Sequence, residues 1–227
     1  MNLSLIHQLL TSGVKSIRVG NIIFFLRMGK VCQRVLNGAN SGKNWKRTEK
    51  RVESNEQFAG DRRMSSHMKD VYEMLPVWQH AAAYRTGNTK TSDSYRHRVN
   101  HGFITPQGEV KDFKHFVVSD GALLLPLHMS MTRENNTITL TWDNQSHSAS
   151  ARATDIIHVI VIGSTRPDAL MLLHGPLVTR AEGTATFEVE AEKGEILHVY
   201  PFFGNAENNA FSPNEYFEAL ANIEASA

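Results

Sequence analysis

The side chains with the best spacing for chemistry in this sequence are His97 and His101. They lie four residues apart in a segment with a helical pattern, which is the spacing of two zinc ligands on one helix face. Arg96 and Arg98 flank His97 and would repel a cation, and the pattern supplies no third ligand. We therefore expect no metal site and no cofactor. A metal-assisted enzyme centred on the two histidines remains a third hypothesis.

A basic stretch around Trp45 offers a different chemistry, because an aromatic ring among cations can hold single-stranded nucleic acid by stacking and phosphate neutralisation. The residues that we expect to contact nucleic acid or another partner are Arg34, Lys43, Trp45, Lys46, Arg47, Lys50 and Arg51. Residues 1–65 hold twelve Lys or Arg against four Asp or Glu, a net charge of +8, whereas residues 66–227 hold twelve against nineteen, or −7. Such asymmetry also arises when basic and acidic parts of proteins face each other, so both explanations stay open.

Sequence motifs for nucleophilic catalysis and phosphate binding are absent: there is no Gly-x-Ser-x-Gly, Gly-x-Gly-x-x-Gly or Walker motif. Cys32 is the only cysteine, which excludes an internal disulfide. The acidic residues between 182 and 195 lack the order of a calcium-binding loop. His158 and His198 lie in apolar strands and are expected to be core or edge histidines with a hydrogen-bond partner. We predict that the protein is not an enzyme.

Two apolar runs around Met28 and Gly29 predict a β-hairpin over residues 21–36. Gly29 accepts a positive φ, but Met28 would be strained in a type I′ turn, which leaves a longer loop as an alternative. The basic residues of the hairpin, Arg27, Lys30 and Arg34, are expected to protect an exposed sheet edge from aggregation.

Helical periodicity follows, and the predicted helices cover residues 54–75, 76–84 and 91–101. Gly60 weakens the first of them, and Pro76 ends or kinks it. Residues 111–118 form a short strand or an extended linker in this interpretation.

The C-terminal part alternates apolar and polar residues with period two, which predicts about seven strands. They cover residues 128–132, 137–142, 155–162, 169–174, 184–190, 195–203 and 215–218. The segment 155–162 is apolar on both faces and is expected to be a central strand covered on each side. We predict an α+β, mainly β protein, in which a hairpin plus helical region (residues 1–125) precedes an immunoglobulin- or fibronectin-like β-sandwich (residues 126–227).

Four features in order resemble a large family of uncharacterised proteins of about this length from Bacteroides and relatives, a domain of unknown function. They are the hairpin segment 20–30, the helix start Glu56-Gln57, the strand 137–143 and the segment 198–203. The likeness covers about residues 13–217. The hairpin followed by a Gln-containing helix also resembles small structural proteins of bacteriophages, although Met28 stands where Asn is commoner and an Asn-Pro-x-Thr connector is missing. The resemblance implies no activity, cofactor or catalytic residue.

We therefore expect a non-enzymatic structural or protein-interaction module, self-assembling through the hairpin or of phage or mobile-element origin. Nucleic-acid binding by the basic N-terminal region is the alternative. No small-molecule substrate and no membrane association are expected. Residues 1–12 lack a basic start and a cleavage site, and no apolar run is long enough to span a membrane, so we expect a cytoplasmic protein.

Overall fold

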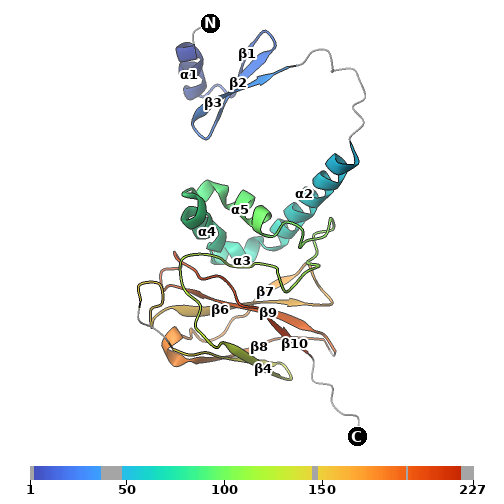
Figure 1. The fold of residues 1–227 in the computed structure, drawn as a ribbon, viewed down its shortest axis with the longest axis vertical. Helices are drawn as coiled ribbons and strands as arrows, with labels where there is room; N and C mark the ends of the chain where they lie inside the picture. Colours follow the sequence, from blue (N-terminus) through green and yellow to red (C-terminus); the bar gives the residue numbers. More distant parts are fainter. Residues whose placement is uncertain (1–2, 37–47, 145–147, 193, 221–227) are drawn as a thin grey trace. The chain divides into compact units, whose positions relative to one another are not determined.

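The structure is a computed structural model that describes residues 3–36, 48–144, 148–192 and 194–220 (Figure 1). The chain divides into two compact units, Met1–Thr48 and Glu49–Ala227. The expected boundary near residue 125 falls inside the second unit, because the helices pack on the C-terminal sheets.

The first unit contains a helix and a three-stranded antiparallel sheet in the order β1-β2-β3. Its elements are α1 (Leu3–Thr11), β1 (Ile17–Val19), β2 (Ile22–Arg27) and β3 (Lys30–Val35). The predicted hairpin is confirmed, and Arg27 pairs with Lys30 across a two-residue turn. Met28 and Gly29 both have positive φ, 52° and 75°. The hairpin therefore has a two-residue turn, although the left-handed backbone conformation is energetically unfavourable for Met28.

Helices open the second unit: α2 (Glu49–His67), α3 (Lys69–Met74), α4 (Val77–Thr86), the 3-10 turn η2 (Thr89–Thr91) and α5 (Ser92–Val99). The first helix begins five residues before the predicted start and gives way to α3 before Pro76. Gly60 lies within α2, where a Cβ atom would come within 2.1 Å of the Thr105 carbonyl oxygen. Glycine at this position therefore permits the 104–106 segment to approach the helix.

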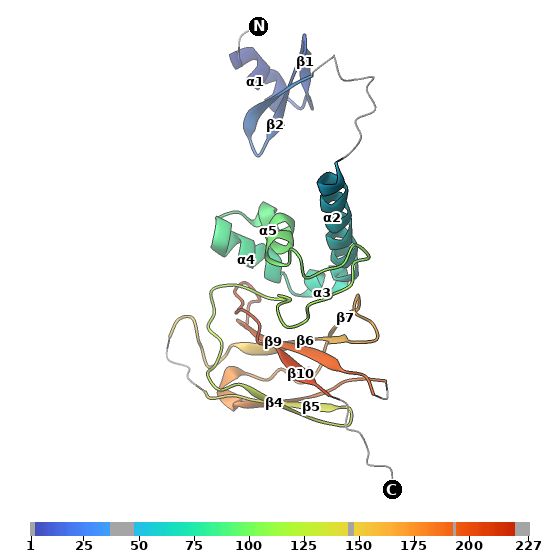
Figure 2. The same cartoon turned by 45° about the vertical axis from the view of Figure 1, so that its right-hand side comes forward.

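Seven strands complete this unit: β4 (Ser130–Glu134), β5 (Thr137–Thr141), β6 (Ile156–Gly163), β7 (Leu170–Leu172), β8 (Thr184–Glu188), β9 (Leu197–Gly204) and β10 (Phe217–Ala219), with the 3-10 turn η3 (Arg180–Glu182) before β8. They form two antiparallel sheets with the orders β10-β9-β6-β7 and β4-β5-β8 (Figure 2). Every predicted C-terminal strand overlaps one of these, whereas residues 111–118 contain no strand. The protein is thus mixed helix and sheet, with ten strands in three sheets among the described residues.

Both faces of the β10-β9-β6-β7 sheet are covered, as the apolar pattern of residues 155–162 predicts. On one face Val159 and Phe203 share a core with Leu140 of the other sheet. On the opposite face Ile160 and Tyr200 pack in one cluster that includes Met64. Helices, the larger sheet and the smaller sheet therefore follow one another in three layers (Figure 1).

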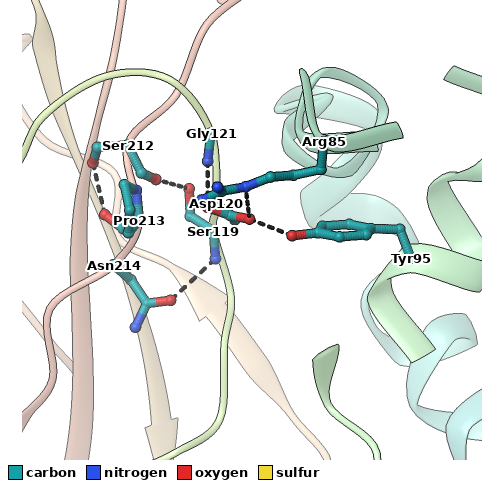
Figure 3. A network of polar contacts seen from close by, with 8 residues as sticks. All are labelled: Arg85, Tyr95, Ser119, Asp120, Gly121, Ser212, Pro213 and Asn214. Carbon is teal, nitrogen blue, oxygen red and sulfur yellow. Dashed lines mark hydrogen bonds and ion pairs between the residues drawn. The ribbon is translucent and has the colours of Figure 1, made fainter. Parts of the chain in front are cut away.

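A buried polar network joins the helices to the sheets (Figure 3). Arg85 of α4 donates two hydrogen bonds to the Asp120 carboxylate, at 3.0 and 2.8 Å, and the Tyr95 hydroxyl of α5 donates a third. Ser119 donates to the Ser212 carbonyl at 2.6 Å. Burial by itself raises the pKa of Asp120, but the hydrogen bonds from Arg85 and Tyr95 outweigh it and leave that pKa below its usual value. The ionised carboxylate is thus the link between the layers.

Candidate functional site

The first unit has a basic sheet face, which we define as the β1-β2-β3 face that carries Arg18, Ile23, Phe25, Arg27, Lys30, Cys32 and Arg34. The strand register brings them together: Arg18 pairs with Ile23, which pairs with Arg34, and Phe25 pairs with Cys32. Because side chains opposite each other across strands point to the same face, these seven share one surface. The four cationic side chains are exposed and surround the half-buried ring of Phe25.

The opposite face of this sheet is apolar and is covered by α1. Phe24 is buried with Ile6 and Leu10 of the helix, and Val19 and Leu26 pack against them. Every second residue of β2 is thus used for the core. The period-two alternation that forms this core also directs the cations of the strands away from it.

The charge of the first unit has a single sign. Residues 1–48 contain no Asp or Glu, and the first acidic residue of the chain is Glu49. The basic residues of the unit are Lys15, Arg18, Arg27, Lys30, Arg34, Lys43, Lys46 and Arg47. With no carboxylate in the unit to neutralise them, the cations of the basic sheet face create a positive potential that favours an anionic partner.

In the second unit, Asp61 of α2 lies beside His97 of α5 and His101, which follows this helix. One potential ligand atom from each of these three residues lies within 4.8 Å of the others. The His97 Nδ1 atom contacts the Asp61 carboxylate, and the rings of His97 and His101 meet edge to face with centroids 5.5 Å apart. The sequence pattern of the two histidines supplied no third ligand. The structure supplies Asp61, which lies 36 residues before His97 and on another helix.

Asp61 is buried at 6 % exposure, and among the described residues neither of its carboxylate oxygens accepts a conventional hydrogen bond. Burial raises the pKa of Asp61, and the neighbouring His97, His101 and Arg96 side chains oppose that rise. The close polar contact of the carboxylate is thus the one with His97, and its second oxygen has no hydrogen-bond partner among the described residues.

A cavity of about 670 Å³ adjoins this cluster between α2, α3 and α5. Asp61, His97 and Arg96 line it together with the apolar side chains of Met64 and Phe116. The Arg96 guanidinium is held in place by Ser65 and Asp93. The cavity thus has a mixed lining, in which polar and charged side chains outnumber the apolar ones.

The model of a family of unknown function, DUF6266, matches residues 14–216. The chain belongs to this family. The match begins after α1 and extends through nearly all of the second unit, so the basic sheet face, the cavity and the strands from β1 to β9 lie within the family region, whereas β10 follows it.

Beyond the DUF6266 family, the chain has little similarity to known proteins in the comparisons that follow. No curated protein matches the chain. Among solved structures, the crystal structure of the chicken CNTN1 FN1–FN3 domains is similar over 45% of this chain at 12% identity, with a TM-score of 0.34. This chain covers 32% of that one. The helices of the described residues include none with the length and apolar character of a membrane span.

Of the seven residues predicted to contact a partner, the structure describes three, and they lie in two different units. Arg34 lies on β3 as part of the basic sheet face, whereas Lys50 and Arg51 are exposed on the first turn of α2 in the other unit. The remaining four, Lys43, Trp45, Lys46 and Arg47, lie outside the described residues. The sequence interpretation missed Arg18 and Phe25. The alternation of β2 could have indicated Phe25, but Arg18 reaches this face by pairing with Ile23 from β1, a strand that was not predicted.

The remaining chemical expectations fall on ordinary structural positions. Cys32 is half-buried next to Phe25 on the basic sheet face. The His198 Nδ1 atom makes a hydrogen bond of 3.0 Å with the Tyr216 hydroxyl, which confirms a partnered histidine. His158 instead has no hydrogen-bond partner for its buried Nε2 atom among the described residues, and burial lowers its pKa to about 4.

Proposed function

We propose that this protein is a non-enzymatic binding module whose first unit holds single-stranded nucleic acid on its basic sheet face. The observation that carries the proposal is the register that places four cations around Phe25 on one sheet face. Aromatic rings on a sheet stack with bases and cations beside them neutralise phosphates, which is how many sheet proteins hold single strands. The absence of any carboxylate in residues 1–48 supports an anionic partner.

The geometry favours a single strand over a duplex. Strands of a sheet lie about 4.8 Å apart, so Arg18 and Arg34, two strands apart, span only about 10 Å. A face of this width with a half-buried ring at its centre presents a stacking platform to an unpaired base. The faces of bases inside a duplex are covered by the neighbouring base pairs and are not accessible to such a platform.

The salt dependence of binding tests this proposal quantitatively. If four phosphates are neutralised, log K should fall with log salt at a slope of about −3 for a single strand. Fluorescence anisotropy of a labelled mixed-sequence oligonucleotide, as DNA and as RNA, measures this slope on the full chain. Arg18→Gln and Arg34→Gln should each reduce its magnitude by about 0.7. Lys15→Gln, which removes a charge outside the three strands, is the matched control for net charge.

A substitution at the ring separates stacking from charge. Phe25→Leu keeps an apolar side chain and every cation, so it should weaken binding by about 1–3 kcal/mol per stacked base while leaving the salt slope unchanged. A triple variant, Trp45→Leu with Lys46→Gln and Arg47→Gln, tests the alternative that the basic stretch after β3 is the contact region. If only the triple variant loses binding, the sheet face is not the site. If the affinity of the intact chain for the oligonucleotide does not depend on salt concentration, neither the basic sheet face nor the basic stretch after β3 is a phosphate-binding site.

Self-association through the hairpin is the second candidate function, and a specific observation favours it. Strand β3 is an edge strand, six residues long, in a unit whose described core consists of three buried residues, Ile6, Leu10 and Phe24. Small domains with so little core are commonly completed by a partner. We infer that β3 pairs with β3 of a second copy, as an added strand.

The single cysteine makes this second candidate testable. A homobifunctional thiol reagent should crosslink two chains at Cys32 if two β3 strands pair, and light scattering after size exclusion should give a dimer. Gln33→Pro removes a backbone N–H from β3 and should abolish the dimer. A monomer at high protein concentration contradicts this candidate and leaves nucleic-acid binding unaffected.

For the second unit we propose a fibronectin-like sandwich as the scaffold. The core shared by β4-β5-β8 and β10-β9-β6-β7 supports it. An experimental structure of the full chain, compared strand by strand with fibronectin domains, tests this assignment.

A further inference from the structure

Asp61, His97 and His101 form a cluster that the proposed function does not use. It belongs to the second unit, so it can be considered independently of the basic sheet face. Two imidazoles and one carboxylate are a common ligand set for zinc and for other first-row transition-metal ions. Calcium and magnesium prefer sites made of oxygen atoms, so this set selects against them.

The buried carboxylate is the reason to infer a ligand here. Asp61 is more than nine-tenths buried, and among the described residues its oxygens have only the contact with His97. A simple ion pair between Asp61 and His97 would use one carboxylate oxygen. It would leave the other oxygen unsatisfied and would give His101 no role beyond its edge-to-face contact with the His97 ring. A divalent cation bound to all three residues satisfies the carboxylate and uses both rings.

The geometry requires a small local adjustment to reach coordination. Ligand atoms around a tetrahedral zinc ion lie roughly 3.3 Å apart, given bonds of about 2.0–2.1 Å. The contact between His97 and Asp61 must lengthen, and the 4.8 Å spread of the three ligand atoms must contract. His101 is exposed, so its side chain is free to rotate toward the other two.

We propose that Asp61, His97 and His101 hold one divalent transition-metal ion of the zinc type. Three protein ligands leave a fourth position open, and the cavity of about 670 Å³ is lined by two of the three, Asp61 and His97. Arg96 also lines this cavity, and with the bound ion it gives the open position a net positive surrounding. Water or a small anionic ligand completes the coordination.

Titration of the full chain with Co²⁺ and Zn²⁺ tests the proposal. Co²⁺ bound to imidazole and carboxylate ligands in a four-coordinate site has strong visible absorption, and Zn²⁺ should displace it with a stoichiometry of one ion per chain. Asp61→Asn and His101→Gln should each weaken Zn²⁺ binding, measured by calorimetry, by more than the 10- to 100-fold that is usual for residues outside the ligand shell. His115→Gln is the matched control, because His115 forms an exposed pair with Asp112 and has no place in the cluster.

Thermal unfolding gives a second readout that distinguishes ligand loss from misfolding. Zn²⁺ should raise the midpoint of the wild-type protein and of His115→Gln, but not that of Asp61→Asn or His101→Gln. His101 is exposed, so its variant should fold even if Asp61→Asn does not. The proposal is overturned if Zn²⁺ binds wild type, Asp61→Asn and His101→Gln with equal affinity, which would indicate adventitious binding to surface histidines. It is also overturned if the wild-type protein binds no Zn²⁺.

Discussion

In the first unit one face of the sheet is covered by α1 and the other stays exposed, whereas in the second unit both faces of the β10-β9-β6-β7 sheet are covered. Both sheets are antiparallel and both have apolar residues in alternation or in continuous runs. The half-covered sheet keeps its cations on a surface available to a partner. The fully covered sheet has no free face, so the candidate site of the second unit lies among its helices instead.

The two units also differ in the sign and the burial of their charged residues. All charged residues of the first unit are Lys or Arg, and the unit needs few buried polar contacts. The second unit pairs its buried charged residues: Arg180 and Asp155 are both buried, and the buried Asp120 pairs with the exposed Arg85. Stability in the second unit thus depends on specific polar pairs, while the first unit depends on a small apolar core and a turn. Four substitutions test this contrast.

The largest effect is expected from Arg180→Met. Arg180 is 1 % exposed, its Nε lies 3.3 Å from the Asp155 carboxylate, and its guanidinium covers the ring of Phe203 at 4.3 Å. Removing the cation leaves Asp155 buried without its partner, which should lower the free energy of unfolding by about 3–5 kcal/mol. Denaturant unfolding measures the loss, and Arg152→Met, at an exposed position, is the control. Equal stabilities of the two variants would contradict a structural role of the pair.

A pH effect of up to about 3 kcal/mol is expected from His158. Burial near Phe202 and Phe211 lowers its pKa to about 4, whereas the unfolded chain has the ordinary value of 6.5. The unfolded state therefore binds more protons between these values, and stability falls as pH decreases from 6.5 to 4. His158→Leu should remove this part of the pH dependence, measured by unfolding at pH 7 and pH 4.5. The exposed His174→Leu should keep it.

Gly60→Ala should destabilise the second unit by about 1–3 kcal/mol, because the new Cβ atom meets the Thr105 carbonyl oxygen. Helix propensity alone predicts the opposite, a gain of about 1 kcal/mol. Ser54→Ala, at an exposed position of the same helix, isolates the propensity term and should be neutral or slightly stabilising. Thermal unfolding of the three proteins decides between the two effects. A stabilised Gly60→Ala would show that the close approach is not maintained.

The smallest effect is expected in the first unit, where Met28 adopts a φ of 52°. Met28→Asn should stabilise the hairpin by about 1 kcal/mol or less, because Asn tolerates the left-handed conformation. Hydrogen exchange of the β2 and β3 amides should slow, while exchange in β6 and β9 stays the same. A change in both units would show that their stabilities are coupled.

Local pattern determined most of the elements. Apolar runs around a turn predicted the hairpin, and short alternating or apolar segments predicted all seven C-terminal strands. The apolar run of residues 155–162 also predicted that both faces of β6 are covered, because successive side chains of a strand point to opposite faces. The short strand β1 and the early start of α2 at Glu49 were missed. Three residues of β1 are too few for a period to be recognised.

Tertiary structure alone decided which residues meet. Asp61 joins His97 and His101 because α2 and α5 lie side by side, and no spacing in the sequence encodes that approach. Arg18 and Arg34 share one sheet face because both β1 and β3 pair with β2. Glycine is needed at position 60 because the loop around Thr105, 45 residues later, packs against α2 there. Sequence determines what each segment can form by itself through local sterics and alternation. The contacts that create a site come from packing between distant segments, where the free energy depends on the whole fold.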